Sequence, residues 1–262
     1  MTEKSIVVTG ASGGIGAALA KQLSARGDKI LLAARTQTKL ETIATECGKN
    51  TIPAVADVTK REDVIKLCED AIREFGNLDV WVNNAGRGIV RSVLDLTDED
   101  FDEMMLSNVK SALYGMQAVI PHFKKRGMGH LINVSSYLGR VPWITFRSAY
   151  SAAKSALNVL TANLRMELRS EYPNIHVSLV LPGAVSTEFG ANSLHIESAK
   201  IPPGFRSLHG VQSPEEVAAI IVQLIDKPEA EVYTNPIQGE SAKRYYRDVA
   251  VFEEELAKQM QS

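Results

Sequence analysis

The chain has 262 residues, of which 45% are hydrophobic, and its formal net charge is -2. These values are typical of a globular protein with one sizeable core, and the near balance of 29 basic and 31 acidic residues gives no electrostatic reason to expect nucleic-acid binding. The sequence shows no signal-peptide pattern and no apolar run of transmembrane length, so we expect a cytoplasmic protein without membrane contact.

The first part of the chain alternates short β-branched runs with helical segments. Strands are predicted at residues 5–9, 29–34, 51–56 and 78–82, and helices at 17–23, 37–47 and 60–75. This alternation predicts a parallel sheet with helices on both faces, because right-handed crossovers place the helices there. No linker or change in composition interrupts the pattern, so we expect one domain that spans residues 1–262.

The second part continues the pattern with longer helices. Helices are predicted at residues 101–125, 149–171 and 213–225, and strands at 130–134, 176–181 and 231–234. Ser213 begins the last of these helices, with Pro214 at its first position and Glu216 completing a capping box. The chain as a whole predicts an α/β fold, a Rossmann-like doubly wound parallel sheet of about seven strands.

A C-terminal helical extension is expected at residues 239–260. Its apolar stripe consists of Ala242, Tyr245, Val249, Phe252, Leu256 and Met260. This stripe could pack on its own domain, cover the mouth of a substrate site, or lie on a membrane surface. Three consecutive glutamates at 253–255 argue against an anionic lipid surface.

Three glycines lie in the turn between the first strand and the first helix. Gly10, Gly14 and Gly16 would let the backbone approach a pyrophosphate, whose charge then lies at the N-terminus of the helix. Their spacing differs from the G-x-G-x-x-G of other dinucleotide-binding folds. Glycines in a tight turn are also consistent with a turn and nothing more.

The residue that follows the second strand bears on the choice of cofactor. A carboxylate at this place binds the ribose 2′-hydroxyl of NAD, whereas the 2′-phosphate of NADP requires a cation. The sequence has Ala34 followed by Arg35, so we expect NADP(H), with Ser12 as a second contact to the phosphate. Arg35 could instead be an ordinary solvated charge at the end of a strand.

Two further polar groups follow the next strands. Asp57 and Val58 come after the third strand, and Asn83-Asn84-Ala85-Gly86 comes after the fourth. Open α/β sheets bind ligands at this carboxyl edge, which favours a cofactor site there. Each group is also compatible with an ordinary turn.

A tyrosine and a lysine share one face of the predicted helix at 149–171. Tyr150 and Lys154 are four residues apart, and a neighbouring ammonium lowers the pKa of a phenol by stabilising the phenolate. The hydroxyl of Ser136, after the preceding strand, could hold the oxygen that receives the proton. As isolated residue types, Tyr and Lys at this spacing are more often a surface pair.

The glycine loop, the Asn-Asn-Ala-Gly motif and the set of Ser136, Tyr150 and Lys154 resemble the short-chain dehydrogenase/reductase family, from residue 9 to about residue 233. The resemblance implies that these three side chains are catalytic and that Asn108 supports a water-mediated proton path. It also implies that the segment after the sixth strand cups the nicotinamide. The cofactor-binding residues on this interpretation are Gly10, Ser12, Gly14, Ile15, Gly16, Arg35, Asp57, Val58, Asn84, Ala85, Gly86, Tyr150, Lys154, Pro182, Gly183, Val185 and Thr187.

One spacing departs from the family pattern. Ser136 lies fourteen residues before Tyr150, where the family has thirteen, so the loop has gained a residue around positions 143–146. Ser136 keeps its place relative to the strand as the second serine of a pair, and we choose it over Ser135. The five histidines are scattered and Cys47 and Cys68 lie far apart, so no metal site is expected.

The resemblance implies an NADP(H)-dependent oxidoreductase that interconverts a carbonyl and an alcohol. Residues 87–93, 137–146 and 187–212 would form the substrate walls, and their apolar members favour an apolar or lipid-like small molecule. These members are Val90, Leu138, Trp143, Ile144, Phe146, Phe189, Leu194, Phe205 and Leu208. The alternatives are a non-catalytic NADP(H)-binding regulatory or scaffold protein and an epimerase or dehydratase of the same fold. The resemblance also implies a homodimer or homotetramer that pairs the helices at 101–125 and 149–171.

Overall fold

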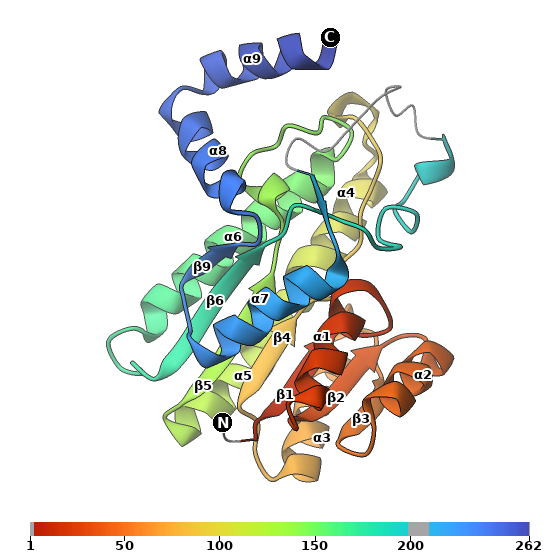
Figure 1. The fold of residues 1–262 in the computed structure, drawn as a ribbon, viewed down its shortest axis with the longest axis vertical. Helices are drawn as coiled ribbons and strands as arrows, with labels where there is room; N and C mark the ends of the chain where they lie inside the picture. The colour runs from red at the N-terminus through yellow and green to blue at the C-terminus, as the bar shows by residue number, and fades with distance from the viewer. Residues whose placement is uncertain (1–2, 199–209, 262) are drawn as a thin grey trace.

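The computed structural model describes residues 3–198 and 210–261, with side chains through Lys258 (Figure 1). Within these residues, seven parallel strands form one sheet in the order β3-β2-β1-β4-β5-β6-β9. The strands are β1 (Ser5–Thr9), β2 (Lys29–Ala34), β3 (Thr51–Val55), β4 (Val80–Asn83), β5 (Gly129–Val134), β6 (Ile175–Leu181) and β9 (Glu231–Tyr233). The parallel sheet and its strand number confirm the predicted fold class.

Helices cover both faces of the sheet. One face carries α1 (Gly14–Ala25), α2 (Gln37–Cys47) and α7 (Pro214–Asp226), and the other carries α3 (Arg61–Phe75), α5 (Ser111–Arg126) and α6 (Ser148–Leu168). Successive strand residues alternate between the two cores: Ile6 and Val8 pack under α1, whereas Val7 packs under α3. This two-sided burial explains why the strands are continuous apolar runs in the sequence.

The long helix expected at 101–125 is divided into three parts. Residues Asp98–Met105 form α4, Leu106–Lys110 form a π-helical turn, and the chain then continues as α5. The helix starts at Asp98, within the segment 97–100 whose composition indicates a helix start, and Thr97 and Asp100 form a capping box there. The π turn contains Asn108, and π turns inside helices occur frequently at functional sites.

A second, two-stranded sheet that the sequence did not predict closes the substrate segment. Its strands, β7 (Ala184–Val185) and β8 (Val211–Gln212), are parallel and two residues long. Two residues are too few to produce a hydrophobic period, so no sequence pattern marks them. The pair joins the start of the expected substrate loop at 187–212 to its end, and residues 199–209 of that loop lie outside the described residues.

The C-terminal extension consists of two helices where one helical segment was expected. These are α8 (Pro236–Arg247) and α9 (Val249–Gln261), and the chain is extended at Asp248 between them. Ala242 and Phe252 pack against Tyr137 and Val141, so the apolar stripe covers the domain's own loop after β5. Met260 has no described side chain.

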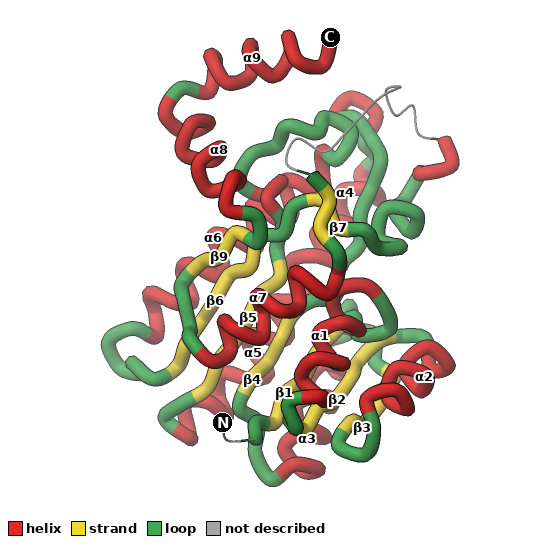
Figure 2. Tube along the Cα trace, in the orientation of Figure 1, coloured by secondary structure: helices red, strands yellow, loops and turns green. Residues whose placement is uncertain are grey.

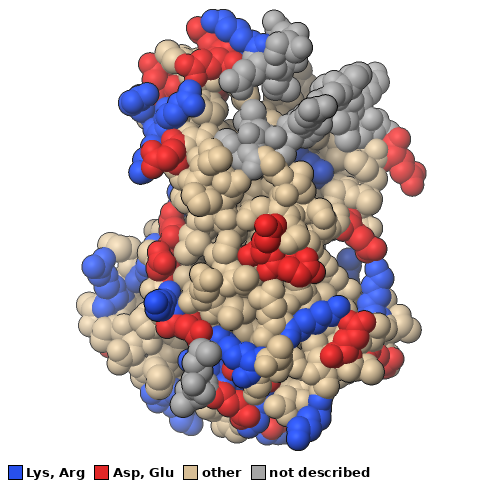
Figure 3. All heavy atoms as spheres, in the orientation of Figure 1, with Lys and Arg blue, Asp and Glu red and all other residues tan. Residues whose placement is uncertain are grey.

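The surface of the extension carries both signs of charge. Figure 3 shows Lys or Arg and Asp or Glu side chains on the upper part of this face, where Figure 1 places α8 and α9. Across the described ranges, no helix combines the length and apolar character needed to cross a membrane.

The cap of α7 provides a direct test of the local fold. Ser213 Oγ accepts a hydrogen bond from the Glu216 N–H at 3.1 Å, and the Glu216 carboxylate accepts one from the Ser213 N–H at 2.7 Å. We expect Ser213→Ala to lower the free energy of unfolding by about 1 kcal/mol, measured by urea denaturation. The matched change Thr38→Ala, inside α2, removes no cap and should have no such effect. Equal stability of the two variants would contradict this role of Ser213.

Candidate active site

The predicted site residues meet in a cavity of about 950 Å³ at the carboxyl ends of the strands. The loops that follow β1 to β6 line it, together with several of residues 187–196. Figure 2 draws the loops of the chain in green. Seventeen of the predicted catalytic and cofactor-binding residues line this cavity. Gly16 and Asn108 do not, and both lie behind its wall.

The glycine loop is packed too closely for side chains at two positions. Gly10 has φ +66°, and a β-carbon there would lie 2.8 Å from the Ala85 α-carbon. A β-carbon at Gly16 would lie 2.5 Å from the Gly10 carbonyl oxygen. Gly16 therefore supports the loop from behind, while Gly10 and Gly14 present bare backbone to the cavity at the start of α1.

The residues after β4 fasten the glycine loop to the sheet. The Asn84 side-chain amide donates to the carbonyl oxygens of Thr9 (2.9 Å) and Gly10 (3.2 Å). In return, Thr9 Oγ1 accepts from the backbone N–H groups of Asn84 (3.0 Å) and Ala85 (3.1 Å). The neighbouring Asn83 donates to Asn133 Oδ1 at 2.8 Å and so ties β4 to β5. The Asn-Asn-Ala-Gly motif therefore does more than form a turn, because its two asparagines also tie neighbouring elements together.

Arg35 and Asp57 lie at the end of the cavity formed by β2 and β3. Arg35 is exposed and lines the cavity beside Ser12. The Asp57 carboxylate accepts hydrogen bonds from the Thr59 N–H (3.1 Å) and hydroxyl (2.7 Å). Burial acts to raise the pKa of Asp57, but the Thr59 bonds and the charge of Arg35 hold it below its ordinary value. Both the turn and the cofactor-site interpretation fit this geometry.

Tyr150 and Ser136 face each other across the middle of the cavity. The Tyr150 side chain is 7% exposed, and its ring centre lies 5.5 Å from that of Phe189. Burial raises the pKa of the phenol above its ordinary value, while the hydrogen bond with Ser136 and the charge of Arg147 act to lower it. The site thus offers two hydroxyl groups to a single oxygen atom.

The two serines after β5 have different surroundings. Ser135 Oγ donates to Asn158 Oδ1 at 2.6 Å and is committed to the packing of α6. Ser136 Oγ accepts from the Leu138 N–H at 3.2 Å and faces Tyr150. The geometry therefore favours Ser136. The longer loop that follows brings Trp143, Ile144 and Phe146 to the cavity wall.

Lys154 lies one helical turn beyond Tyr150 and is 3% exposed. Its Nζ donates to the Val134 carbonyl oxygen at 3.0 Å and lies 5.7 Å from the centre of the Tyr150 ring. Burial lowers the pKa of Lys154 to about 8. Sequence reasoning assigned the lowering of the Tyr150 pKa to Lys154. The charge of Arg147, which it did not consider, acts to lower that pKa.

Asn108 supports the loop that faces Lys154. Its side-chain amide donates to the Arg87 carbonyl oxygen at 2.9 Å and accepts from the Arg87 N–H at 3.2 Å. A β-carbon at Gly86 would lie 2.7 Å from Asn108 Oδ1 and 3.4 Å from Lys154 Nζ, so the two side chains flank the same glycine. These contacts of Asn108 are those of a residue that shapes the loop.

The segment after β6 brings Pro182, Gly183, Val185 and Thr187 to the cavity. Thr187 Oγ1 accepts from the Phe189 N–H at 3.2 Å, and its methyl group lies against Gly14. The backbone of Val185 belongs to β7, which positions this segment over the glycine loop.

Gln238 and Arg147 are among the cavity residues that sequence reasoning missed. Gln238, at the start of α8, packs against Gly183, is 1% exposed and has no partner for its Oε1 among the described residues. Arg147 immediately precedes α6, and its charge at a helix start was the only available signal. Of the expected apolar walls, Val90 and Leu194 pack behind the cavity lining, and Phe205 and Leu208 lie outside the described residues.

Comparison with known proteins gives consistent matches. A family model described as short chain dehydrogenase matches residues 4–197. The uncharacterized oxidoreductase YxnA of Bacillus subtilis is 36% identical over 237 residues, which cover 89% of this chain and 65% of that protein's length.

Solved structures agree with the sequence matches. A short-chain dehydrogenase/reductase from Burkholderia phymatum in complex with NAD has a TM-score of 0.84 at 22% identity and covers 95% of each chain. An alcohol dehydrogenase from the archaeon Thermococcus sibiricus, complexed with 5-hydroxy-NADP, has a TM-score of 0.77 at 28% identity, over 90% of this chain and 98% of that one. The chain therefore belongs to the short-chain dehydrogenase/reductase family of oxidoreductases.

Proposed function

We propose that this protein is an NADP(H)-dependent oxidoreductase that interconverts a ketone or aldehyde and the corresponding alcohol. The observation that carries the proposal is the meeting of Ser136, Tyr150 and Lys154 in one cavity that also contains the bare glycine loop. Family membership indicates the reaction class, an oxidation or reduction. The arrangement of the Ser136 and Tyr150 hydroxyl groups provides a proton donor for the carbonyl oxygen.

The residues present fit a dinucleotide. The glycine loop leaves backbone room at the N-terminus of α1, where phosphate charge is stabilised. The cavity volume lies at the upper end of the range usual for ligand sites, as an extended cofactor together with a substrate requires. Gly10, Gly14 and the backbone beside Ser12 would hold the pyrophosphate, and Thr187 and Gly183 would border the nicotinamide.

The preference for NADP(H) rests on Arg35. This exposed cation follows β2, where Ala34 replaces the carboxylate that would repel a 2′-phosphate. The carboxylate of Asp57 is nearby but is held by Thr59. The solved structures named above carry NAD in one case and an NADP derivative in the other, so the family alone does not select the cofactor.

In the proposed mechanism, a reduced nicotinamide bound in this cavity would supply the hydride for the carbonyl carbon. Tyr150 donates its proton to the carbonyl oxygen as the C=O π electrons move onto that oxygen, and Ser136 hydrogen-bonds to the same atom. In the oxidative direction Tyr150 accepts the alcohol proton. The Lys154 ammonium group is held by the Val134 carbonyl oxygen and lies beside the phenol. It can exchange a proton with Tyr150 and pass it on toward the loop that Asn108 shapes.

A non-catalytic scaffold is the alternative function. A scaffold would need the cofactor cradle but not a buried phenol facing a hydroxyl group. A buried Lys154 lowers the stability of the folded protein, because its charged form is desolvated. Catalysis explains why such a residue is present, whereas cofactor binding alone does not require it. The geometry therefore favours the enzyme.

The proposal includes a homodimer or homotetramer formed through α4, α5 and α6. Phe101 on α4 and Val159 and Met166 on α6 are exposed by 44%, 59% and 68%, which supports burial of this face against a second copy. Cys47 and Cys68 are both free, and this suits the reducing cytoplasm.

We expect Tyr150→Phe to lower the rate of NADPH-dependent carbonyl reduction by on the order of 10³-fold, because the proton donor is lost. NADPH binding, measured by fluorescence titration, should stay unchanged. Tyr114→Phe is the matched control, since Tyr114 stacks under Arg61 away from the cavity. Turnover by Tyr150→Phe at the normal rate would remove the mechanism.

Arg35→Gln should weaken NADPH binding by about tenfold and leave NADH binding nearly unchanged, since only NADPH carries the 2′-phosphate. Titration of both cofactors into the wild type and the variant measures the effect. Arg73→Gln, on the exposed side of α3, controls for the general loss of a positive charge. If the wild type bound NADH as tightly as NADPH, the proposed preference would be wrong.

The buried Lys154 predicts a pH-dependent stability. Its pKa is about 8 in the folded protein and 10.5 ordinarily, so between these values the unfolded chain binds a proton that the folded chain has released. The free energy of unfolding of the wild type should therefore rise relative to that of Lys154→Met by about 3 kcal/mol as the pH increases from 8 to 10.5. Urea titrations of both proteins across this range measure the difference. A pH-independent difference would show that Lys154 is not desolvated.

A further inference from the structure

We propose that Arg147 binds a carboxylate on the substrate, so that the natural substrate is a small oxo acid or hydroxy acid. This inference rests on the proposed oxidoreductase function and defines its substrate class. It differs from the apolar or lipid-like small molecule that the wall residues favour in the sequence.

Arg147 lies beside the reacting groups. It is the residue immediately before α6, three positions ahead of Tyr150, and its side chain lines the same cavity. Residues three apart at such a position are about one helical turn from each other, roughly 5–6 Å between β-carbons. The positive charge of Arg147 acts to lower the pKa of Tyr150.

The guanidinium hydrogen-bonds only to neutral groups among the described residues. Its Nη1 donates to the Ile89 carbonyl oxygen at 3.2 Å and to Ser193 Oγ at 2.6 Å. Both of these bonds come from one nitrogen, which leaves the Nε and Nη2 edge for a two-point contact with a carboxylate. No ion pair joins Arg147 to an acidic side chain in the part of the chain that the structure describes.

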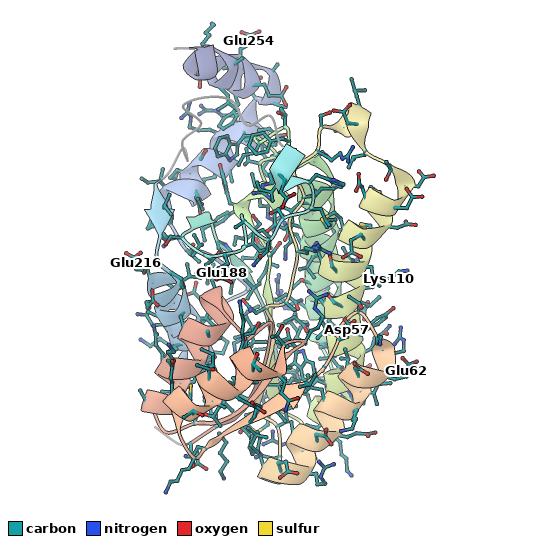
Figure 4. The ribbon with its side chains drawn as sticks, turned by 90° about the vertical axis from the view of Figure 1, so that its right-hand side faces the viewer. Asp57, Glu62, Lys110, Glu188, Glu216 and Glu254 are labelled. Atoms are coloured by element: carbon teal, nitrogen blue, oxygen red, sulfur yellow. The ribbon has the colours of Figure 1, made fainter. Side chains whose placement is uncertain are left out.

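Each acidic side chain that lines the cavity has another partner. Glu103 pairs with Arg87 at 3.4 Å and Glu188 pairs with Lys39 at 3.1 Å. Asp57 is held by Thr59 (Asp57 and Glu188 are labelled in Figure 4). Arg147 is therefore a cation on the substrate side of the cavity whose charge these carboxylates do not compensate.

Partial burial makes that charge costly. Arg147 is half-buried, desolvation lowers its pKa, and Phe146, Ile144 and Phe189 line the same cavity. A partly desolvated cation without a counter-ion is destabilising, and an anion that enters the cavity offsets this cost. Because Arg147 lies about one turn from Tyr150, the carboxylate must be close to the carbonyl group in the substrate.

Arg147 could instead serve as a clip, because its two hydrogen bonds join the loop at Ile89 to the loop at Ser193. The two roles predict different kinetics. A clip shapes the cavity for every substrate alike, whereas an anion site discriminates between an acid and its neutral ester. Arg147 could also change the rate by acting on the pKa of Tyr150. That effect is the same for the acid and for the ester, so it cancels in the ratio of their kcat/KM values.

The test compares acetoacetate with methyl acetoacetate, and pyruvate with methyl pyruvate, as substrates for NADPH-dependent reduction. We expect wild-type kcat/KM to favour at least one acid over its ester by about tenfold, mainly through KM. Arg147→Gln should abolish this preference and Arg147→Lys should retain part of it. Ser193→Ala, which breaks the clip but keeps the charge, should retain it as well. Arg73→Gln removes a paired cation that does not line the cavity and should leave the ratio unchanged.

A second readout does not need turnover. Calorimetric titration of acetoacetate and pyruvate into the NADP⁺-loaded protein should detect binding of at least one acid to the wild type and to Arg73→Gln, and much weaker binding to Arg147→Gln. Equal ratios in the wild type and Arg147→Gln, or no binding of either acid to the wild type, would overturn the inference. Failure to reduce any carbonyl, with acid binding intact, would instead count against the proposed function alone.

Discussion

The burial of Tyr150 and Lys154 in one cavity, with the half-buried Arg147 beside them, is the constraint on which the rest of this structure depends. Tyr150, Lys154 and Arg147 are all desolvated, and their hydrogen bonds go to a serine hydroxyl and to backbone carbonyl groups, with no carboxylate from the described residues among them. Neutral partners fix the positions of these groups without neutralising the charged ones. Charge compensation is thereby left to the molecules that bind, a substrate and a phosphate-bearing cofactor.

The fold supplies those neutral partners through its strand ends. Parallel strands finish at one edge, so the Val134 carbonyl at the end of β5 reaches Lys154 on α6 while the loop after β4 braces the glycine loop. The π turn around Asn108 holds Arg87 and Gly86 against the same cavity. The extension α8–α9 covers the loop after β5 and brings Gln238 to Gly183. Each of these elements fixes a wall of the cavity from behind.

The sheet and most helices could be predicted because apolar runs and their spacing depend on local burial. The candidate site could be predicted as far as its members follow strand ends in chain order, as Gly10, Asn84 and Ser136 do. The π turn could not, since one extra residue in a helical turn barely changes the apolar period. The roles of Arg147 and Gln238 were missed because they arise from contacts with Ser193 and Gly183, which only the tertiary fold brings close.

The most direct test of this account follows the hydrogen atoms. The wild-type protein is given a reducible carbonyl compound and NADPH that carries deuterium at the transferable position of the nicotinamide, and the alcohol is analysed by mass spectrometry and NMR. The account predicts deuterium on the carbinol carbon and a solvent-derived proton on the oxygen, because hydride comes from the cofactor and Tyr150 relays the proton. An alcohol without deuterium on that carbon would contradict it, as would bound NADPH that reduces no carbonyl compound at all.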